Sequence, residues 1–172
     1  MTPITIPGTT PIVTPPFYVR QALRNEIRPL IEEHHYIHSL GKVTVAFGLW
    51  GTEKEGSPGG SPVGAITYGQ VSARGLAQSI FEGGNQGNCF EFLRMVVLDN
   101  CPCPRSWFIA QTIKFIKKEY PHIRALVSFA DQTEGHFGYV YQASNWLYTG
   151  TTKKYYHYFK DGKRINKRVV WE

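Results

Sequence analysis

The order of segments between residues 90 and 130 restricts the fold of this chain more than any other feature. Residues Phe90–Leu98 form an apolar run that predicts a buried strand, and Arg105–Tyr120 predicts a helix with one apolar face. A second strand is expected over Ile123–Ala130. A strand, a crossover helix and another strand return to the same sheet, so the two strands should be parallel neighbours. The start of the helix and the end of the second strand then open at the same edge of the sheet.

The preceding part of the chain predicts antiparallel structure. Residues Val43–Trp50 and Pro62–Gly69 resemble paired strands, joined by a loop over Gly51–Ser61 that is rich in Gly, Pro and Ser. Residues 17–34 have apolar positions at helical spacing, which predicts a first helix that is kinked or divided at Pro29. The fold class expected is therefore α/β (α+β): a central mixed, mostly antiparallel sheet that is flanked by helices.

Side chains that exchange protons are unusually dense over residues 127–150. Asp131 follows the second strand, a polar turn comes next, and a short helix is expected over His136–Ala143, followed by a strand over Asn145–Tyr148. Functional groups in open α/β sheets lie beyond the carboxyl ends of the strands, which favours Asp131 and Tyr141 as site residues. Two structural roles compete with this interpretation: Asp131 as a turn-capping carboxylate and Tyr141 as a core tyrosine.

Arg94 is the only cation inside its predicted strand. A buried charge needs either a partner or a function. An ion pair with Glu91 or Asp131 would satisfy the first requirement, and the clamping of an anionic substrate group would satisfy the second. Ser106 stands where a hydroxyl would cap the long helix, and that helix start is also suited to an anion.

Histidines cluster at the end of the first predicted helix. His34 and His38 would lie one turn apart if the helix continued, which is a spacing that two ligands of one metal ion can adopt. The competing interpretation is a polar helix end, because histidines there interact favourably with the helix dipole.

The net charge of +6 is concentrated at the C-terminus. Residues 151–172 contain seven cations and two carboxylates, and thus carry five of the six net positive charges. Strands are expected over Tyr155–Lys160 and Lys163–Trp171, with Asp161-Gly162 as a tight turn between them. Basic and aromatic side chains interleave in this hairpin, which suits phosphate contact and base stacking, although a solvated basic face is an equal alternative. The residues expected to contact nucleic acid are Lys153, Lys154, Lys163, Arg164, Lys167 and Arg168.

The totals indicate one domain. A length of 172 residues suits a single core, preceded by a Pro-rich extension over residues 1–16 and comprising residues 17–172. Three cysteines, an odd number, are expected to be reduced thiols in a cytoplasmic protein. No secretory signal and no membrane segment are expected.

The motif in the aromatic segment resembles that of a known family. Asp131, Gly135-His136, Gly138, Tyr141-Gln142-Ala143, Asn145-Trp146, Tyr148 and Gly150 are similar to the signature of the Mom family of phage DNA-modification proteins, which are distantly similar to GNAT acyltransferases. The resemblance covers roughly residues 30–150. It implies a GNAT-like fold and an enzyme that converts adenine in double-stranded phage DNA to its N6-carbamoylmethyl (acetamido) derivative, which protects the DNA from host restriction. It also implies a location in the host cytoplasm.

The resemblance implies roles for individual residues. Asp131 would be a base or an orienting carboxylate, Tyr141 a proton donor or stacking partner, and Arg94 a clamp. The His35-Tyr36 pair matches a motif of the family and offers nitrogen and phenolate ligands suited to iron. The N6-linked methylene cannot come from simple acyl transfer, so the donor must be activated in another way, for which a redox metal is one hypothesis.

A donor such as acetyl-CoA, or another small molecule, would contact Arg105 and Ser106, and Ser106 would also serve the reaction as a hydrogen-bond donor. The connector DNCPCPRS differs from the Gly-rich turn that most acetyltransferases have before the long helix, because prolines lack amide donors. Ordinary coenzyme A binding is therefore in question.

Two other functions compete. A GNAT-like acyltransferase acting on a small-molecule or protein amine would bind coenzyme A and have no salt-sensitive affinity for DNA. A non-enzymatic DNA-binding module would depend on the basic hairpin and not on Asp131 or Arg94. The high aromatic content is also compatible with a homodimer.

Overall fold

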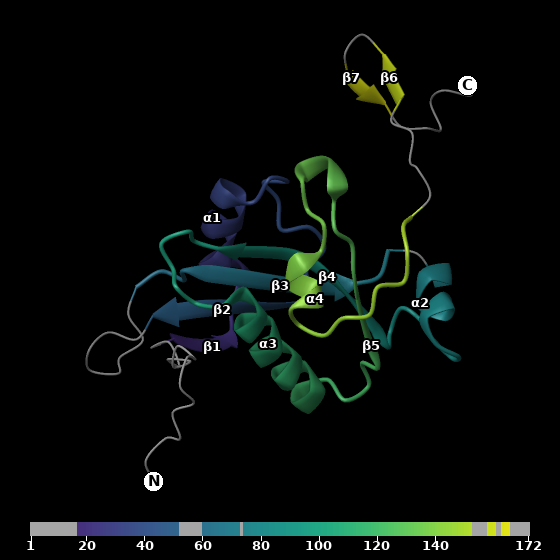
Figure 1. The fold of residues 1–172 in the computed structure, drawn as a ribbon, viewed down its shortest axis with the longest axis horizontal. Helices are drawn as coiled ribbons and strands as arrows, with labels where there is room; N and C mark the ends of the chain where they lie inside the picture. The colour runs from purple at the N-terminus through teal and green to yellow at the C-terminus, as the bar shows by residue number, and fades with distance from the viewer. Residues whose placement is uncertain (1–16, 52–59, 73, 153–157, 161–162, 166–172) are drawn as a thin grey trace, which may run out of the picture.

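The protein is described by a computed structural model over residues 17–51, 60–72, 74–152, 158–160 and 163–165. A five-stranded sheet forms its centre, and helices cover both faces (Figure 1). The elements are β1 (Phe17–Gln21), α1 (Arg24–His34), β2 (Val45–Gly51), β3 (Gly64–Gln70), α2 (Arg74–Ile80), β4 (Cys89–Val97), α3 (Arg105–Glu119), β5 (Ala125–Ser128), the 3₁₀ helix η1 (Gln132–Glu134), α4 (Tyr139–Gln142), β6 (Tyr158–Lys160) and β7 (Lys163–Ile165).

The sheet has the mixed topology expected from the sequence. Its strand order is β1-β2-β3-β4-β5. Neighbours from β1 to β4 are antiparallel, whereas β4 and β5 are parallel and are joined by α3. The fold-class prediction is therefore confirmed.

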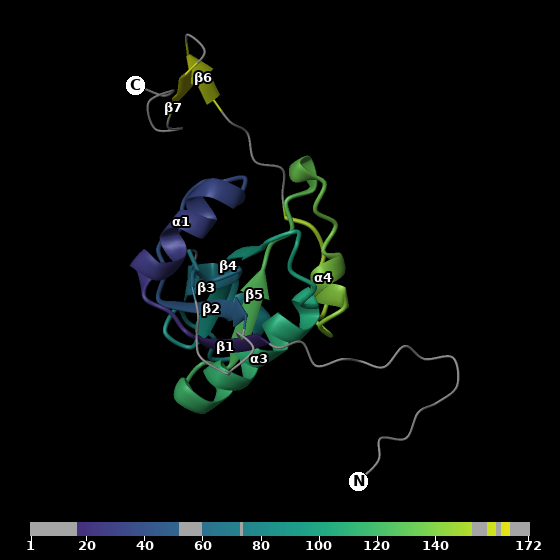
Figure 2. The ribbon, with the colours of Figure 1, turned by 90° about the vertical axis from the view of Figure 1, so that its left-hand side faces the viewer.

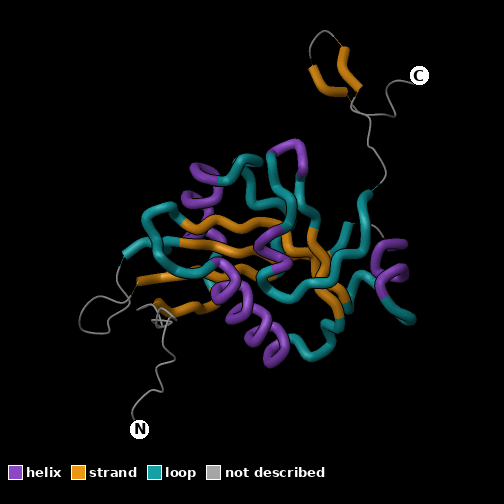
Figure 3. Tube along the Cα trace, in the orientation of Figure 1, coloured by secondary structure: helices purple, strands orange, loops and turns teal. Residues whose placement is uncertain are grey.

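Two apolar cores lie on opposite faces of this sheet. Phe108, Ile109 and Ile116 of α3 pack on Phe47 and Tyr68 on one face. On the other face α1 packs through its three buried residues, Ile27, Leu30 and Ile31, on β2, β3 and β4. Figure 2 shows α1 on one side of the strands and α3 and α4 on the other, and Figure 3 shows the strands running between these helices. Because helices cover both faces of the sheet, the side chains on both faces of β2 and β3 are buried. This explains why the sequences of these two strands are almost continuously apolar.

The predicted helix over residues 17–34 is wrong in its first third. Residues 17–21 form β1, which pairs with β2 from Phe17↔Gly51 to Gln21↔Phe47. Aromatic and β-branched residues favour such a pleated edge, and pairing overrides the helical spacing of the apolar positions. The helix begins at Arg24 and runs through Pro29, whose ring is exposed, so only one backbone hydrogen bond is lost.

A bulge in β4 lies next to Arg94. Thr67 pairs with Arg94, but Tyr68 pairs with Phe92, so Leu93 is an extra residue in β4. Bulges bend a strand and redirect side chains. Here the guanidinium of Arg94 reaches the loop that follows α1, where its Nε donates to the carbonyl of Ser39 at 2.9 Å.

The segment after β5 also differs from the prediction. Residues Asn145–Tyr148 are not a strand, and the helix expected over 136–143 is reduced to the single turn α4. The 3₁₀ helix η1 lies in the preceding segment, which was expected to be a polar turn. The C-terminal hairpin is described only in part: β6 and β7 pair over three residues each, whereas its predicted turn, Asp161-Gly162, and the outer parts of both predicted strands lie outside the described residues. The Pro-rich extension over residues 1–16 and most of the loop after β2 also lie outside them. In the described part of the chain, no helix has the length and apolar character needed to cross a membrane.

Candidate functional site

A pocket opens where β4 and β5 part. Their pairing ends at Phe92↔Ser128, and β4 continues for five more residues. Beyond that point the pocket has a volume of about 580 Å³, within the range of about 300–1,000 Å³ that is usual for small-molecule sites. Its polar and titratable lining comes from His34, His35, Tyr36, Arg94, Asp99, Arg105, His136, Tyr139 and Tyr141.

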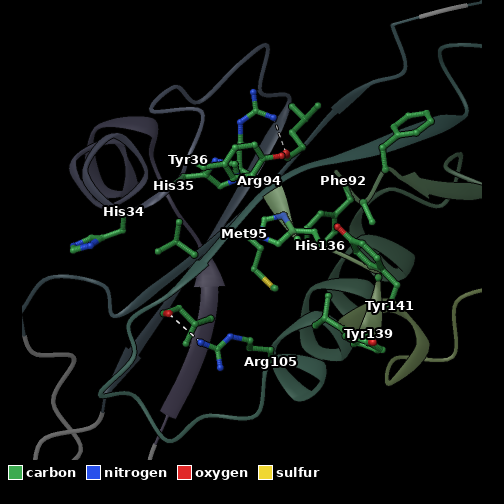
Figure 4. Close-up of a pocket in the computed structure, with 18 of the residues that line it drawn as sticks. His34, His35, Tyr36, Phe92, Arg94, Met95, Arg105, His136, Tyr139 and Tyr141 are labelled. Atoms are coloured by element: carbon green, nitrogen blue, oxygen red, sulfur yellow. Dashed lines mark hydrogen bonds between the residues drawn. The ribbon is translucent and has the colours of Figure 1, made fainter. Parts of the chain in front are cut away.

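One wall of the pocket is a stack of rings from distant parts of the chain. His35 stacks on Tyr36 with ring centroids 4.5 Å apart, and the edge of His136 approaches Tyr36 at 5.2 Å. Tyr36 follows α1 and His136 follows η1, so the stack joins the two sides of the opening (Figure 4). Burial, followed by the carboxylate of Asp131, raises the pKa of Tyr36. Tyr36 is therefore a neutral phenol at pH 7.

His35 is held in one neutral form. Its Nδ1 accepts a hydrogen bond from the amide of Ile37 at 3.1 Å, which leaves the proton of the neutral ring on Nε2. Burial, with smaller contributions from Arg94, His136 and His38, lowers the pKa of His35 to about 4. His35 thus offers an uncharged N–H donor at physiological pH.

Arg94 is a half-buried cation at the base of the pocket. Besides the bond to Ser39, its Nη1 donates to the carbonyl of Leu93 at 2.7 Å. The ion pair with Glu91 or Asp131 considered as an alternative does not form among the described residues, which place no carboxylate within 4.0 Å of Arg94. Backbone carbonyls position the guanidinium but do not neutralise it, so its charge remains free to act on a ligand.

Tyr141 faces the pocket from α4. Its ring meets Phe92 edge-on at 5.6 Å and lies 5.3 Å from Trp146. Burial raises the pKa of Tyr141, and the nearby hydroxyl of Ser128 partly offsets the rise. The Oγ of Ser128 and the Nε1 of Trp146 are both buried without a hydrogen-bond partner of normal geometry. Buried polar atoms without partners are unfavourable unless a ligand or a water molecule satisfies them.

Asp131 does not line the pocket. Its Oδ1 accepts from the Thr133 amide at 3.0 Å and from the Thr133 hydroxyl at 2.6 Å, which makes it the N-cap of η1. These bonds, and then His136, lower its pKa, so it is an anion at pH 7. The geometry therefore matches the turn-capping alternative, in which the carboxylate of Asp131 caps η1 just before His136.

The loop between η1 and α4 carries site residues that the sequence analysis did not select. Gly135 and Gly138 both have left-handed backbone conformations, with φ of 72° and 77°, which glycine adopts without strain. They bracket His136 and Phe137, and both of these residues line the pocket. The spacing of the two glycines was visible in the sequence, but the direction of the loop between them was not.

The start of α3 supplies a second, shallower hollow next to the pocket, lined in part by Pro102, Pro104, Arg105 and Ser106. The predicted cap is wrong: the N-cap is Pro104, no side chain caps the helix, and Ser106 lies inside the first turn. Arg105 reaches the carbonyl of Val97 at 3.5 Å and lies 3.7 Å from a carboxylate oxygen of Asp99. The prolines offer no amides, so this connector does not form the cradle that a coenzyme A pyrophosphate needs. The first amides of α3 are the donors that remain.

The ligand set expected for iron is not assembled. The part of the chain that is described holds no group of three or more His, Cys, Asp or Glu side chains close enough to share a metal ion. His35 uses Nδ1 to accept from Ile37, and its ring is stacked on that of Tyr36. The helix does not continue to His38, so His34 and His38 do not lie one helical turn apart: α1 ends at His34, and His38 has a φ of 51°. The residues present do not fit the iron hypothesis.

The predicted nucleic-acid contacts fall mainly beyond the described structure. Lys163 and Arg164 lie on β7, whereas Lys153, Lys154, Lys167 and Arg168 lie outside the described residues. β6 and β7 lie apart from the five-stranded sheet in both views (Figures 1 and 2). Their role in DNA binding stays a prediction.

Comparison with known proteins identifies the family. The sequence profile of the Mom protein family matches residues 16–172. The chain belongs to the Mom protein family. No curated protein matches the sequence.

Solved structures identify the fold as that of GNAT acetyltransferases. The Mom chain is similar to an aminoglycoside acetyltransferase, meta-AAC0020, from an uncultured soil metagenomic sample in complex with sisomicin, with a TM-score of 0.54 and 10% identity over 84% of this chain and 97% of that chain. A possible acetyltransferase from Clostridium difficile 630 gives a TM-score of 0.54 and 11% identity over 84% and 99%. An integron cassette protein from the mobile metagenome of V. cholerae gives a TM-score of 0.52 and 10% identity over 86% of this chain and 94% of that chain. The Mom chain therefore combines a GNAT-like fold with membership of a separate family, and the two together support a transferase.

The structure gathers some of the predicted site residues and separates others. Arg94, Tyr141, His35, Tyr36 and Arg105 line one pocket. Ser106 lies in the adjoining hollow, and Asp131 lines neither of the two.

Proposed function

We propose that this Mom protein modifies adenine in DNA at N6, giving the N6-carbamoylmethyl derivative, and so protects phage DNA from host restriction. Membership of the Mom family is the observation that carries the proposal. The pocket supports it independently, since a cation, phenols and imidazoles converge at the point where β4 and β5 part.

The chemistry requires help at the adenine amine. The lone pair of N6 is delocalised into the ring, so the amine is a poor nucleophile and must lose a proton as it bonds to carbon. Imidazole rings are suited to hold a nucleobase and to exchange protons, and His136 and His35 both line the pocket. The Nδ1 of His35 already accepts from the Ile37 amide, so His35 presents an N–H donor and His136 is the candidate for accepting the proton. Tyr141 remains protonated at pH 7, because burial raises its pKa, and it is placed to donate a hydrogen bond to the donor or to its leaving group.

Charge at the pocket favours an anionic or polar donor. Arg94 presents a guanidinium that has no carboxylate partner in the described part of the chain, and Arg105 lies beside Asp99 in the same lining. The GNAT-like fold supports an acyl-CoA-type donor held by Arg105 and Ser106. Acetyl-CoA alone would leave an acetyl group on N6, so the carbamoylmethyl product requires a donor that carries the amide and loses a leaving group from its methylene carbon as N6 loses its proton. The proline-containing connector accommodates a coenzyme A pyrophosphate poorly, so another small donor is equally compatible.

Asp131 acts in this proposal as a positioning residue. Its carboxylate caps η1, and the backbone carbonyl of Asp131 accepts from the amide of His136 at 3.1 Å. Both interactions fix the loop that carries His136 into the pocket.

Mass spectrometry of nucleosides from DNA of expressing cells tests the function. Wild type should yield an adenosine adduct that is heavier by a carbamoylmethyl group. Tyr141→Phe should remove the adduct, whereas Tyr148→Phe should retain it, because Tyr148 is exposed and does not line the pocket. Unmodified DNA from folded, well-expressed wild type would refute the proposal.

A GNAT-like acyltransferase acting on a small-molecule or protein amine is the second candidate. The fold shared with acetyltransferases, including an aminoglycoside acetyltransferase, favours it. It predicts tight coenzyme A binding by calorimetry and an affinity for DNA that is negligible at any salt concentration. A non-enzymatic DNA-binding module would instead tolerate Arg94→Ala and Asp131→Ala and fail when Lys163 and Arg164 are replaced.

A further inference from the structure

Exposed apolar rings surround the mouth of the pocket. Phe129, Phe137 and Tyr139 line it with exposed fractions of 46%, 58% and 73%. Burial of such rings is favourable, so their exposure leaves apolar surface available to a partner. A cluster of exposed apolar side chains next to a polar pocket marks a surface for a partner.

Phe137 is held outward by its backbone. It lies between the left-handed Gly135 and Gly138, and a Cβ added at Gly135 would meet no atom within 4 Å. Glycine is therefore favoured at position 135 because its left-handed backbone sets the direction of the chain, and not because a side chain there would clash with a neighbour. The ring of Phe137 lies 6.3 Å from that of Tyr139, with an interplanar angle of 54°, so the two rings form one raised rim.

The residue before Phe137 points to the pocket wall. His136 meets Tyr36 at 5.2 Å, so one short loop carries both a pocket residue and the exposed ring beside it. Figure 4 shows His136 between the Tyr36 side and the Tyr141 side of the pocket, with Tyr139 beside Tyr141. A base that entered the pocket would pass this rim.

Resting on the proposed function, we propose that Phe137 is the wedge that fills the base stack when the target adenine leaves duplex DNA, with Tyr139 as a stacking platform for a flanking base. An adenine inside a duplex cannot reach a pocket unless it is extruded, and the vacated stack is then open to an apolar ring. Exposed aromatic rings also stack on bases regardless of sequence.

Charge complementarity favours DNA as the occupant of this rim. The net charge of +6 lies mainly in residues 151–172, outside this rim, so the charges of the pocket lining are the ones that bear on its occupant. Of the residues that line the pocket, Arg94 and Arg105 are cations and Asp99 is the only carboxylate. A polyanion is attracted to such a surface, and that attraction weakens with salt.

The test measures extrusion without any group donor. Full-length wild type, Phe137→Ala and Phe137→Trp are added to duplexes that carry 2-aminopurine at the target adenine, and the fluorescence of 2-aminopurine is measured. The affinity of each protein is measured separately for a matched duplex and for one in which the target adenine is mispaired (A·A). Wild type and Phe137→Trp should raise the 2-aminopurine fluorescence. Phe137→Ala should abolish the rise and weaken binding to the matched duplex by roughly tenfold or more, but weaken binding to the mispaired duplex much less, because a mispaired base leaves the stack more easily.

A matched control separates this effect from the loss of any exposed apolar side chain. Leu23 is 68% exposed at the start of α1 and does not line the pocket, so Leu23→Ala should behave as wild type. The wedge proposal would be overturned if Phe137→Ala lost the same affinity for matched and mispaired DNA, or if it raised the 2-aminopurine fluorescence as much as wild type does. A change in oligomeric state by light scattering in Phe137→Ala would assign the rim to a second copy instead.

The outcome for the proposed function is read separately. If nucleoside mass spectrometry finds the adduct but wild type produces no 2-aminopurine signal, the wedge is wrong and the modification stands. If wild type leaves cellular DNA unmodified, the function itself is wrong.

Discussion

Acidification is expected to destabilise the protein through His35. This imidazole is 8% exposed, and its pKa is lowered from 6.5 to about 4, chiefly by burial. The folded state therefore binds the proton more weakly than the unfolded chain does. The stability that this group contributes is fully present above pH 6.5 and is lost as the pH falls toward and through about 4.

The magnitude follows from the two pKa values. For 6.5 in the unfolded chain and about 4 in the folded protein, linkage gives a loss of about 2 kcal/mol at pH 5 and about 3 kcal/mol at pH 4, relative to pH 7. Such a loss is a large part of the stability of a typical domain, which is about 5–15 kcal/mol.

Urea unfolding between pH 7 and pH 4, together with NMR titration of the imidazole resonances, measures both quantities. His35→Asn keeps an acceptor for the Ile37 amide but does not titrate, so it should lose most of the acid-dependent destabilisation between pH 6.5 and 5. His34→Gln is the matched control, because the His34 side chain is 42% exposed and should leave the pH profile unchanged. A His35→Asn profile that is identical to wild type, or an NMR pKa near 6.5, would refute the reasoning.

Four further predictions concern the pocket, the loop and the hairpin. Tyr141→Phe should lower the rate of adduct formation by roughly 10²-fold or more, as expected for loss of a proton donor, without lowering the melting temperature by more than a few degrees. Arg94→Lys should impair the reaction nearly as much as Arg94→Ala, because an ammonium cannot reproduce the two backbone contacts of the guanidinium; full activity in the lysine variant would contradict this. Gly138→Ala should destabilise the protein by about 1–2 kcal/mol in urea unfolding, since φ is 77° there, and no measurable loss would contradict the assigned conformation. Replacing Lys163 and Arg164 by glutamine should reduce the slope of log Kd against log salt by roughly 2 if both contact phosphates, whereas an unchanged slope would remove β7 from the DNA interface.

The sequence predicted the centre of the fold better than its margins. The β4–α3–β5 crossover could be recognised because each element is long and its apolar pattern is unambiguous. β1 could not, because Phe17–Gln21 becomes a strand only through pairing with β2, which no local pattern encodes. The bulge at Leu93 was equally hidden, since an extra residue in a strand depends on its partner's register.

The site was predicted by residue type better than by geometry. Arg94 and Tyr141 were selected as polar residues in or beside buried elements, and both line the pocket. His136 and Phe137 were not selected, because their importance depends on two left-handed glycines that direct the loop between them. Asp131 was selected for its position after a strand, yet its carboxylate serves the turn, as short polar side chains at such positions commonly do.

The ring wall of the pocket has a consequence for how the protein folds. Tyr36 and His136 are one hundred positions apart in the chain, and they meet only after α1 has docked on one face of the sheet and η1 has formed after β5. Contacts between such distant residues form late, because closing so long a loop must be offset by structure already in place. A population with an intact sheet and an unassembled site is therefore expected to precede the native state in refolding experiments. Variants that weaken only the η1–α4 loop would extend the lifetime of that population, yielding protein that is folded by circular dichroism but unable to act on a substrate.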